Sequence, residues 1–176
     1  MNEAGQAVLD AIRSRRSIRH YSDEPVSDED LQTILEAGRW APSGLNNQPW
    51  RFVVVRDSEV KNEIAEQTRY REIVRGAPVA IAVFIDNRAS YDRVKDCQGI
   101  GACLQNMCLA THAVGLGGVW LGEILKNKER VAEILATPET YELMAVLAVG
   151  HPQHRRQKSQ RKPLSELIFK EVLTGG

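Results

Sequence analysis

Hydrophobic residues recur at helical spacing in the first forty positions of the chain. The spacing over residues 4–12 predicts a short amphipathic helix that ends near a run of arginines. A second helix is expected after Ser27, because Ser27 and Asp30 stand at the positions of an acidic capping box. Val26 and Leu31 stand at those of a hydrophobic staple. Each helix therefore has one apolar face that must pack against the rest of the fold.

Three short apolar runs predict strands. Residues 52–55 form a β-branched run, whereas residues 78–86 and 143–150 are apolar without alternation. An unalternating apolar run is typical of a strand that is buried on both faces. The two longer runs should therefore lie at the centre of a sheet.

The remaining pattern predicts helices, one glycine-rich turn and an arm. Residues 92–115 indicate a long central helix, and shorter helices are expected over residues 58–67 and 124–136. Ser58 is the expected cap of the first short helix, and Thr137-Pro138 should stop the second. The stretch GLGGVWLG is predicted to be a turn or loop, and LSELIFKEVL a C-terminal arm. Because strands and helices mix without strict alternation, we expect a single α+β domain over residues 1–176.

Composition narrows the class of protein. The chain has 176 residues, 43% of them hydrophobic and 26% charged, with a formal net charge of zero. Zero net charge argues against a broad nucleic-acid surface, and no apolar run reaches the roughly 18 residues of a membrane span. Three cysteines without a C-x-x-C pair favour reduced thiols in a cytoplasmic protein over a disulfide or metal framework.

The charge is unevenly distributed along the chain. Residues 13–19 carry four arginines and residues 151–163 carry five further cations, and neither stretch contains a carboxylate. Guanidinium groups suit phosphate oxygens, so the two stretches suggest a specific anion site. The alternative for the first stretch is a solvated helix end whose cations offset the negative pole of the helix.

The stretch APSGLNNQPW, residues 41–50, gathers side-chain donors and acceptors around a glycine. Such a mixture could meet the edge groups of a flat heterocycle, and it is equally the composition of a helix-to-strand turn. The glycines of GLGGVWLG fail the dinucleotide fingerprint, since Trp120 stands where its last glycine belongs. The four histidines show no metal-ligand pair and no nearby nucleophile signature, so we expect no metal site.

Four motifs in order along the chain carry a resemblance. R-R-S-I-R, A-P-S-G-L-N-N-Q-P-W, G-L-G-G-V-W-L-G and R-K-P-L together resemble the nitroreductase family of FMN-dependent oxidoreductases, over about residues 11–164. The resemblance implies helices around a small mixed, mainly antiparallel sheet. It also implies an intertwined homodimer with two FMN sites at the subunit interface.

The resemblance further implies roles for individual residues. Arg15, Arg16 and Ser17 match positions that hold the FMN phosphate and nearby ribityl oxygens, and Arg161 matches a second phosphate-binding arginine. Arg19 matches the cation that faces N1 and the C2 carbonyl of the flavin. The loop laid along the flavin by the partner subunit matches Pro42, Ser43, Gly44, Asn46 and Gln48. The segment passing near the ring, where a backbone N–H can approach N5, matches Trp120, Leu121 and Gly122. No family contact matches residues 67–75.

The implied activity is a ping-pong oxidoreduction. NADH or NADPH would pass a hydride to flavin N5 and leave, and a small conjugated acceptor such as a nitroaromatic or quinone would follow. The flavin carries this chemistry, so no catalytic side chain is required. Three alternatives remain open: dehalogenation or flavin fragmentation on the same fold, a non-enzymatic flavin sensor or carrier, and an anion- or nucleic-acid-binding module.

Overall fold

The elements are known from a computed structural model that describes residues 2–172. The helical elements are α1 (Glu3–Ser14), α2 (Asp28–Arg39), the 3₁₀ turn η1 (Gly44–Asn46), α3 (Ser58–Ala65), α4 (Arg71–Gly76), α5 (Arg93–Ala113), the 3₁₀ turn η2 (Glu123–Asn127), α6 (Lys128–Ile134) and α7 (Leu164–Leu167). The strands are β1 (Trp50–Val55), β2 (Val79–Asp86), β3 (Gly117–Leu121) and β4 (Tyr141–Gly150).

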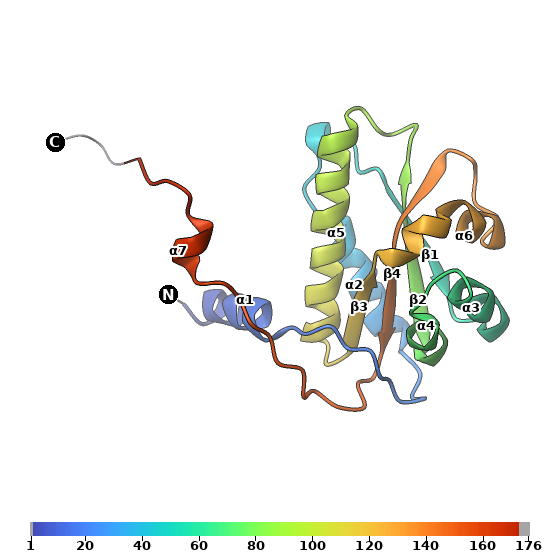
Figure 1. Cartoon of the computed structure of the whole chain (residues 1–176), viewed down its shortest axis with the longest axis horizontal. Helices are drawn as coiled ribbons and strands as arrows, with labels where there is room; N and C mark the ends of the chain where they lie inside the picture. The colour runs from blue at the N-terminus through green and yellow to red at the C-terminus, as the bar shows by residue number, and fades with distance from the viewer. Residues whose placement is uncertain (1, 173–176) are drawn as a thin grey trace.

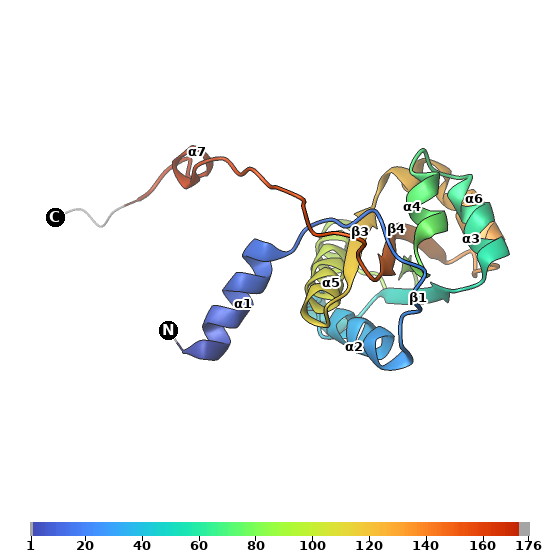
Figure 2. The ribbon, with the colours of Figure 1, turned by 90° about the horizontal axis from the view of Figure 1, so that it is seen from below.

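The four strands form one antiparallel sheet in the order β1-β2-β4-β3. Every residue of β2 is buried, because helices cover both faces of the sheet. Side chains that alternate along β2 enter two separate cores. Helices α2 and α5 lie on one side of the sheet and α3, α4 and α6 on the other (Figure 2). The predicted α+β fold is confirmed, and the unalternating apolar runs do lie at the sheet centre.

The glycine-rich stretch is a strand and not the turn that its composition predicts. Gly117–Leu121 forms β3 and pairs with β4. A Cβ atom on Gly117 would lie 2.7 Å from Ile18, whose backbone N–H donates to Gly118 O at 3.0 Å. Ser17 also bridges Gly118 in a parallel sense. The glycines therefore let the chain that follows α1 lie directly against the edge of the sheet.

Local helix predictions are accurate in part. Ser27 caps α2 as predicted, with Asp30 N donating to its hydroxyl at 3.0 Å. The cap of α3 is Asp57 and not Ser58, because the Asp57 carboxylate accepts from Val60 N at 2.9 Å. Asp and Ser cap helices about equally well, so the residue types alone could not decide between two adjacent positions. The helix expected over residues 124–136 is divided into η2 and α6, and α4 has no counterpart in the prediction.

Both ends of the described chain extend away from the sheet and its helices (Figures 1 and 2). Helix α1 has no buried residue, and every residue from Pro163 to Val172 is exposed, as expected for an arm. Phe169 is 102% exposed in this arm. In the described part of the chain, no helix combines the length and the apolar character needed to cross a membrane.

Candidate functional site

The segment that follows α1 and the segment that follows β4 lie side by side. Ser22 N donates to His151 O at 2.9 Å, and Gln153 N donates to His20 O at 3.1 Å. Further along, Arg155 Nη2 donates to Gly115 O at 2.5 Å, just beyond the end of α5. Two stretches about 135 residues apart in the sequence are thereby brought together beside β3 (Figure 2).

The two basic stretches line one cavity, which we call the cation cradle. It has a volume of about 220 Å³, and its walls are Arg15, Arg16, Ser17, Arg19, Gln157, Lys158, Ser159 and Arg161. Five of these eight residues are cations and none is a carboxylate. The resemblance places five residues of these two stretches near the cofactor phosphate or the flavin N1. The structure brings all five together in the cradle: Arg15, Arg16, Ser17, Arg19 and Arg161.

The hydrogen bonding of the cradle is incomplete. Arg16 Nη1 donates to the carbonyl oxygens of Arg13 and Arg15 at 2.6 and 2.9 Å, which fixes the guanidinium group. Arg16 Nε is buried and has no hydrogen-bond partner among the described residues. A buried unpaired donor costs roughly 1–3 kcal/mol, so an oxygen acceptor bound in the cradle would remove a penalty as well as neutralise charge. A phosphate group fits these donors.

His112 lies beside the cradle, and the charges of the arginines affect its pKa. Its Nε2 atom lies 2.8 Å from Ser14 Oγ, near the end of α1. Burial, and then the charges of Arg155, Arg15 and Arg16, hold the pKa of His112 below its ordinary value. His112 is consequently neutral at neutral pH and leaves the arginines as the charged groups of the cradle.

A second cavity adjoins the cradle, and we call it the aromatic pocket. Its volume is about 260 Å³, and its walls are Arg19, Tyr70, Val119, Trp120, Leu121, Gly122 and Glu123. Arg19 lines both cavities, so they adjoin at this residue. Two of these wall residues are aromatic, Tyr70 and Trp120, and they are 37% and 43% exposed. The joined cavities can therefore take a ligand with an anionic tail and a flat ring.

Glu123 ties the 68–70 stretch to the wall of the aromatic pocket. Its carboxylate accepts from Thr68 Oγ1 at 2.6 Å and from Arg69 N at 3.1 Å, while Lys126 Nζ lies 2.6 Å from its other oxygen. The hydrogen bonds from Lys126 and Thr68 lower the pKa of Glu123 to about 2. No pattern in the sequence marks Glu123 or Tyr70 as a site residue, because the chain segments that carry them are about fifty residues apart.

The 41–50 loop lies elsewhere in the chain. Pro42, Ser43 and Gly44 line a third cavity with residues of the first half of α5, and Asn46 and Gln48 are exposed. The loop contacts α5 at Gly99, where an added Cβ atom would lie 3.5 Å from Pro42 O. The cradle lies near His112, at the other end of the same helix. Thirteen helical residues separate these points by about 20 Å. Neither the cradle nor the aromatic pocket is lined by a residue of this loop.

The loop is nevertheless held in one shape. Leu45, Asn46 and Gln48 have positive φ values of 54°, 56° and 46°, which are strained for residues with side chains. Asp96, buried at the start of α5, accepts from Asn47 Nδ2 at 2.7 Å and thereby braces the loop. Burial raises the pKa of Asp96, but hydrogen bonds from Ser90, Asn47 and two backbone N–H groups outweigh burial and lower it overall.

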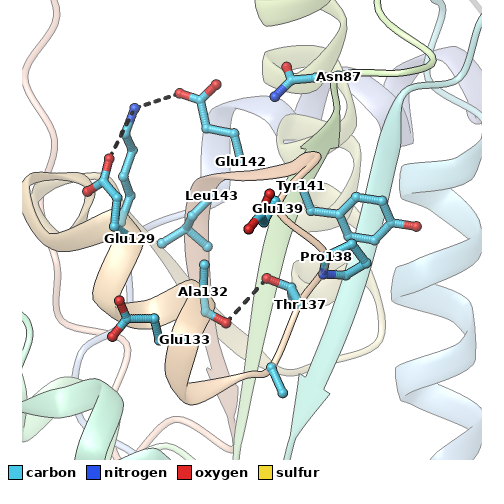
Figure 3. Close-up of a pocket in the computed structure, with 12 residues that line it drawn as sticks. Asn87, Glu129, Ala132, Glu133, Thr137, Pro138, Glu139, Tyr141, Glu142 and Leu143 are labelled. Atoms are coloured by element: carbon cyan, nitrogen blue, oxygen red, sulfur yellow. Dashed lines mark hydrogen bonds and ion pairs between the residues drawn. The ribbon is translucent and has the colours of Figure 1, made fainter.

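A fourth cavity, larger than the three above, has a different character (Figure 3). It measures about 530 Å³ and lies between α6 and β4. Its walls carry Glu129, Glu133, Glu139 and Glu142, with Lys128 paired to Glu142 at 2.8 Å. It contains none of the predicted site residues, and its acidic wall would repel a phosphate. In residues 2–172, no group of three His, Cys, Asp or Glu side chains could hold a metal ion.

Comparison with known proteins gives consistent matches over most of the chain. The family model described as "Nitroreductase family" matches residues 12–69 and 65–151. A protein of Archaeoglobus fulgidus assigned as an NADH dehydrogenase/NAD(P)H nitroreductase is 39% identical over 158 residues, which cover 86% of this chain and 88% of that protein. The NAD(P)H-dependent FMN reductase of Bacillus subtilis is 32% identical over 190 residues, covering 98% of this chain and 75% of that protein.

A solved structure extends the comparison to three dimensions. A protein of Desulfovibrio desulfuricans assigned as a nitroreductase has been crystallised in complex with FMN. This chain superposes on it with a TM-score of 0.91 at 51% identity, and the match covers 99% of each chain.

Proposed function

The chain belongs to the nitroreductase family, and we propose that it is an FMN-dependent oxidoreductase in which NADH or NADPH reduces nitroaromatics, quinones or related conjugated acceptors. One observation carries the proposal: five cations from both ends of the chain line a carboxylate-free cradle that meets an aromatic pocket at Arg19. FMN has a phosphate tail and a flat ring, in the same order.

The cradle residues would hold the phosphate. A phosphate monoester carries about −1.5 to −2 charges near neutral pH, and a partly buried one needs several cations. Arg15, Arg16 and Ser17 would bind it from the N-terminal side, and Arg161 from the C-terminal side. The buried Nε of Arg16 would gain the acceptor that it lacks in the protein alone.

Arg19 and the segment Trp120–Gly122 would orient the ring. Bound FMN supplies hydride transfer through its N5 atom. Arg19, where the two cavities meet, would place a fixed positive charge beside N1 and the C2 carbonyl, where negative charge gathers on reduction. Trp120, Leu121 and Gly122 would form the wall along the ring and offer a backbone N–H there.

We also propose that two copies of the chain complete each site as a homodimer. The loop residues Pro42, Ser43, Gly44, Asn46 and Gln48 are about 20 Å along α5 from the cradle and line neither cavity of the proposed site, so we assign them to a flavin bound to another copy. The exposed apolar residues of α1 and the arm support such a contact, since isolated proteins rarely expose so many together. They are Val8, Ile12, Leu164, Leu167, Ile168, Phe169 and Val172.

The cysteines support work in a reducing compartment, and we propose the cytoplasm. Cys97, Cys103 and Cys108 are all free thiols. Burial raises the pKa of Cys103 to about 12 and that of Cys108 to about 11, so both are inert packing residues at neutral pH. The contacts between the two ends of the chain support treating residues 1–176 as one FMN-binding domain.

Anaerobic turnover tests the proposed function. The purified protein, loaded with FMN, is mixed with NADH or NADPH and a quinone such as menadione, and the loss of nicotinamide absorbance at 340 nm is followed. We expect repeated turnover with parallel initial-velocity plots, as a ping-pong cycle requires. A protein that binds FMN but consumes no more NAD(P)H than one equivalent would be a carrier or sensor, and that result would overturn the proposal.

A further inference from the structure

Arg69 differs from the other arginines that lie outside the two basic stretches. There are nine such arginines, and eight of them pair with a carboxylate: Arg39, Arg51, Arg56, Arg71, Arg75, Arg88, Arg93 and Arg130. Arg69 has no carboxylate within 4.0 Å among residues 2–172. Its charge is left for another partner.

The Arg69 side chain lies against the wall of the aromatic pocket. Its guanidinium carbon stands 4.8 Å from the centroid of the Tyr70 ring, and Arg69 Nη2 donates to the Tyr70 hydroxyl at 2.8 Å. Tyr70 is itself a wall residue of the pocket, together with Arg19 and Trp120. A molecule that stacks on a ring bound in the pocket therefore has the Arg69 cation on its Tyr70 side.

The backbone beneath Arg69 is fixed. Glu123, another wall residue of the pocket, accepts from Arg69 N and from Thr68 Oγ1, and Tyr70 N donates to Thr68 Oγ1 at 3.2 Å. Lys126 pairs with the other Glu123 oxygen, so the negative charge of Glu123 is already offset. Hydrogen bonds that fix the backbone in this way orient a recognition residue. Because the charges of Glu123 and Lys126 offset each other, Arg69 is the cation left unpaired on this side of the pocket among residues 2–172.

We propose that Arg69 is a specificity-determining residue that recognises an anionic substituent, a carboxylate or a phosphate, on molecules that stack on the flavin ring held in the aromatic pocket. The inference rests on the proposed function, because the pocket is also the proposed flavin-ring site. It adds a preference for negatively charged acceptors or nicotinamide nucleotides, which the proposed roles of the cradle and of Arg19 do not require. The anion can belong to the electron acceptor or to the 2′-phosphate of NADPH.

Three variants separate charge recognition from a structural role. Arg69→Gln removes the charge, Arg69→Lys keeps it, and Arg71→Gln removes a neighbouring exposed arginine that pairs with Glu66. Dissociation constants of 4-nitrobenzoate and its neutral analogue 4-nitrobenzamide are measured from the visible spectrum of the oxidised FMN-loaded protein, without NAD(P)H. In a second arm, kcat/KM is measured for NADPH and for NADH with menadione.

The expected result is a preference of the native protein for the charged member in at least one arm. Arg69→Gln should reduce that preference about fivefold, as for a partly exposed ion pair, while Arg69→Lys and Arg71→Gln should retain most of it. A preference that falls in the nitrobenzoate comparison assigns the anion to the acceptor, and one that falls in the nicotinamide comparison assigns it to the 2′-phosphate of NADPH. A preference that is absent from both arms, or unchanged in Arg69→Gln, would overturn the inference while NADH turnover with menadione still supports the proposed function. Absence of FMN binding would overturn both.

Discussion

Replacing Asp96 by Asn should loosen the 41–50 loop selectively. One oxygen of Asp96, Oδ2, accepts from Ser90 Oγ at 2.6 Å and from the backbone N–H groups of Tyr91 and Asp92 at 3.0 and 3.2 Å. The other oxygen, Oδ1, has Asn47 Nδ2 as its one donor among residues 2–172. In Asp96→Asn the amide oxygen can keep the first three bonds, but the new NH₂ group then faces the NH₂ group of Asn47.

The magnitude follows from this single lost contact. A buried hydrogen bond to a charged group contributes about 1.5–3 kcal/mol, and two donors facing each other leave one unpaired. We therefore expect a loss of about 2 kcal/mol in the free energy of unfolding. For a chain of this length, that loss lowers Tm by about 4–8 °C. The loop should also release part of the strain held at Leu45, Asn46 and Gln48.

Thermal unfolding followed by circular dichroism, between pH 7 and pH 3, is the assay. Because the pKa of Asp96 lies below its ordinary 3.8 in the folded state, its charge stabilises the protein above that pH. This contribution is lost as the pH falls through the lowered pKa. The difference between the native protein and Asp96→Asn should thus be greatest near neutral pH and shrink below about pH 4.

Asp92→Asn is the matched control. Asp92 caps α5 by accepting from Lys95 N at 3.0 Å, and Asn caps helices about as well as Asp, so Tm should change little. A double-mutant cycle of Asp96→Asn with Asn47→Ala should give a coupling above about 0.5 kcal/mol. Equal melting temperatures for the two Asp variants, or additive effects in the cycle, would refute the brace.

Three further predictions concern the site and the assembly. Arg19→Ala should lower the midpoint potential of bound FMN by roughly 20–40 mV, equivalent to about 1–2 kcal/mol for two electrons, with FMN still bound; an unchanged redox titration would remove its assigned role. Gly117→Ala should cost about 1–3 kcal/mol in thermal unfolding and weaken FMN binding, because its Cβ would clash with Ile18, whereas Gly76→Ala has no neighbour within 4 Å and should do neither. Deleting residues 164–176 should turn the proposed dimer into a monomer in sedimentation equilibrium, and an unchanged dimer would exclude the arm as its main contact.

The elements that sequence predicts well are those decided by nearby residues. The cap of α2 depends on Ser27 and Asp30, three positions apart, and β2 is marked by its own apolar run. Strand β3 could not be predicted in this way. Gly117 is required by Ile18, about a hundred positions earlier, and the same composition is typical of a turn.

The same rule decides which parts of the candidate site can be predicted from the sequence. The two basic stretches are visible in the sequence because they concentrate cations without carboxylates, and the structure joins them in one cradle. Asp96, Glu123 and Arg69 carry no such local signal. Asp96 and Glu123 act through Asn47 and Thr68, which are 49 and 55 positions away, and Arg69 stands out only when every ion pair of the fold is known.

Comparing the affinities of FMN and riboflavin tests the cation cradle most directly, because the two molecules differ only in the phosphate. The protein freed of flavin is titrated with each, and quenching of flavin fluorescence is followed. We predict that FMN binds at least about 100-fold more tightly, and that Arg15→Gln and Arg161→Gln each narrow this gap. Arg156→Gln, an exposed cation that does not line the cradle, should leave it unchanged. Equal affinities for FMN and riboflavin, or a gap that neither cradle variant alters, would contradict a phosphate held by both ends of the chain.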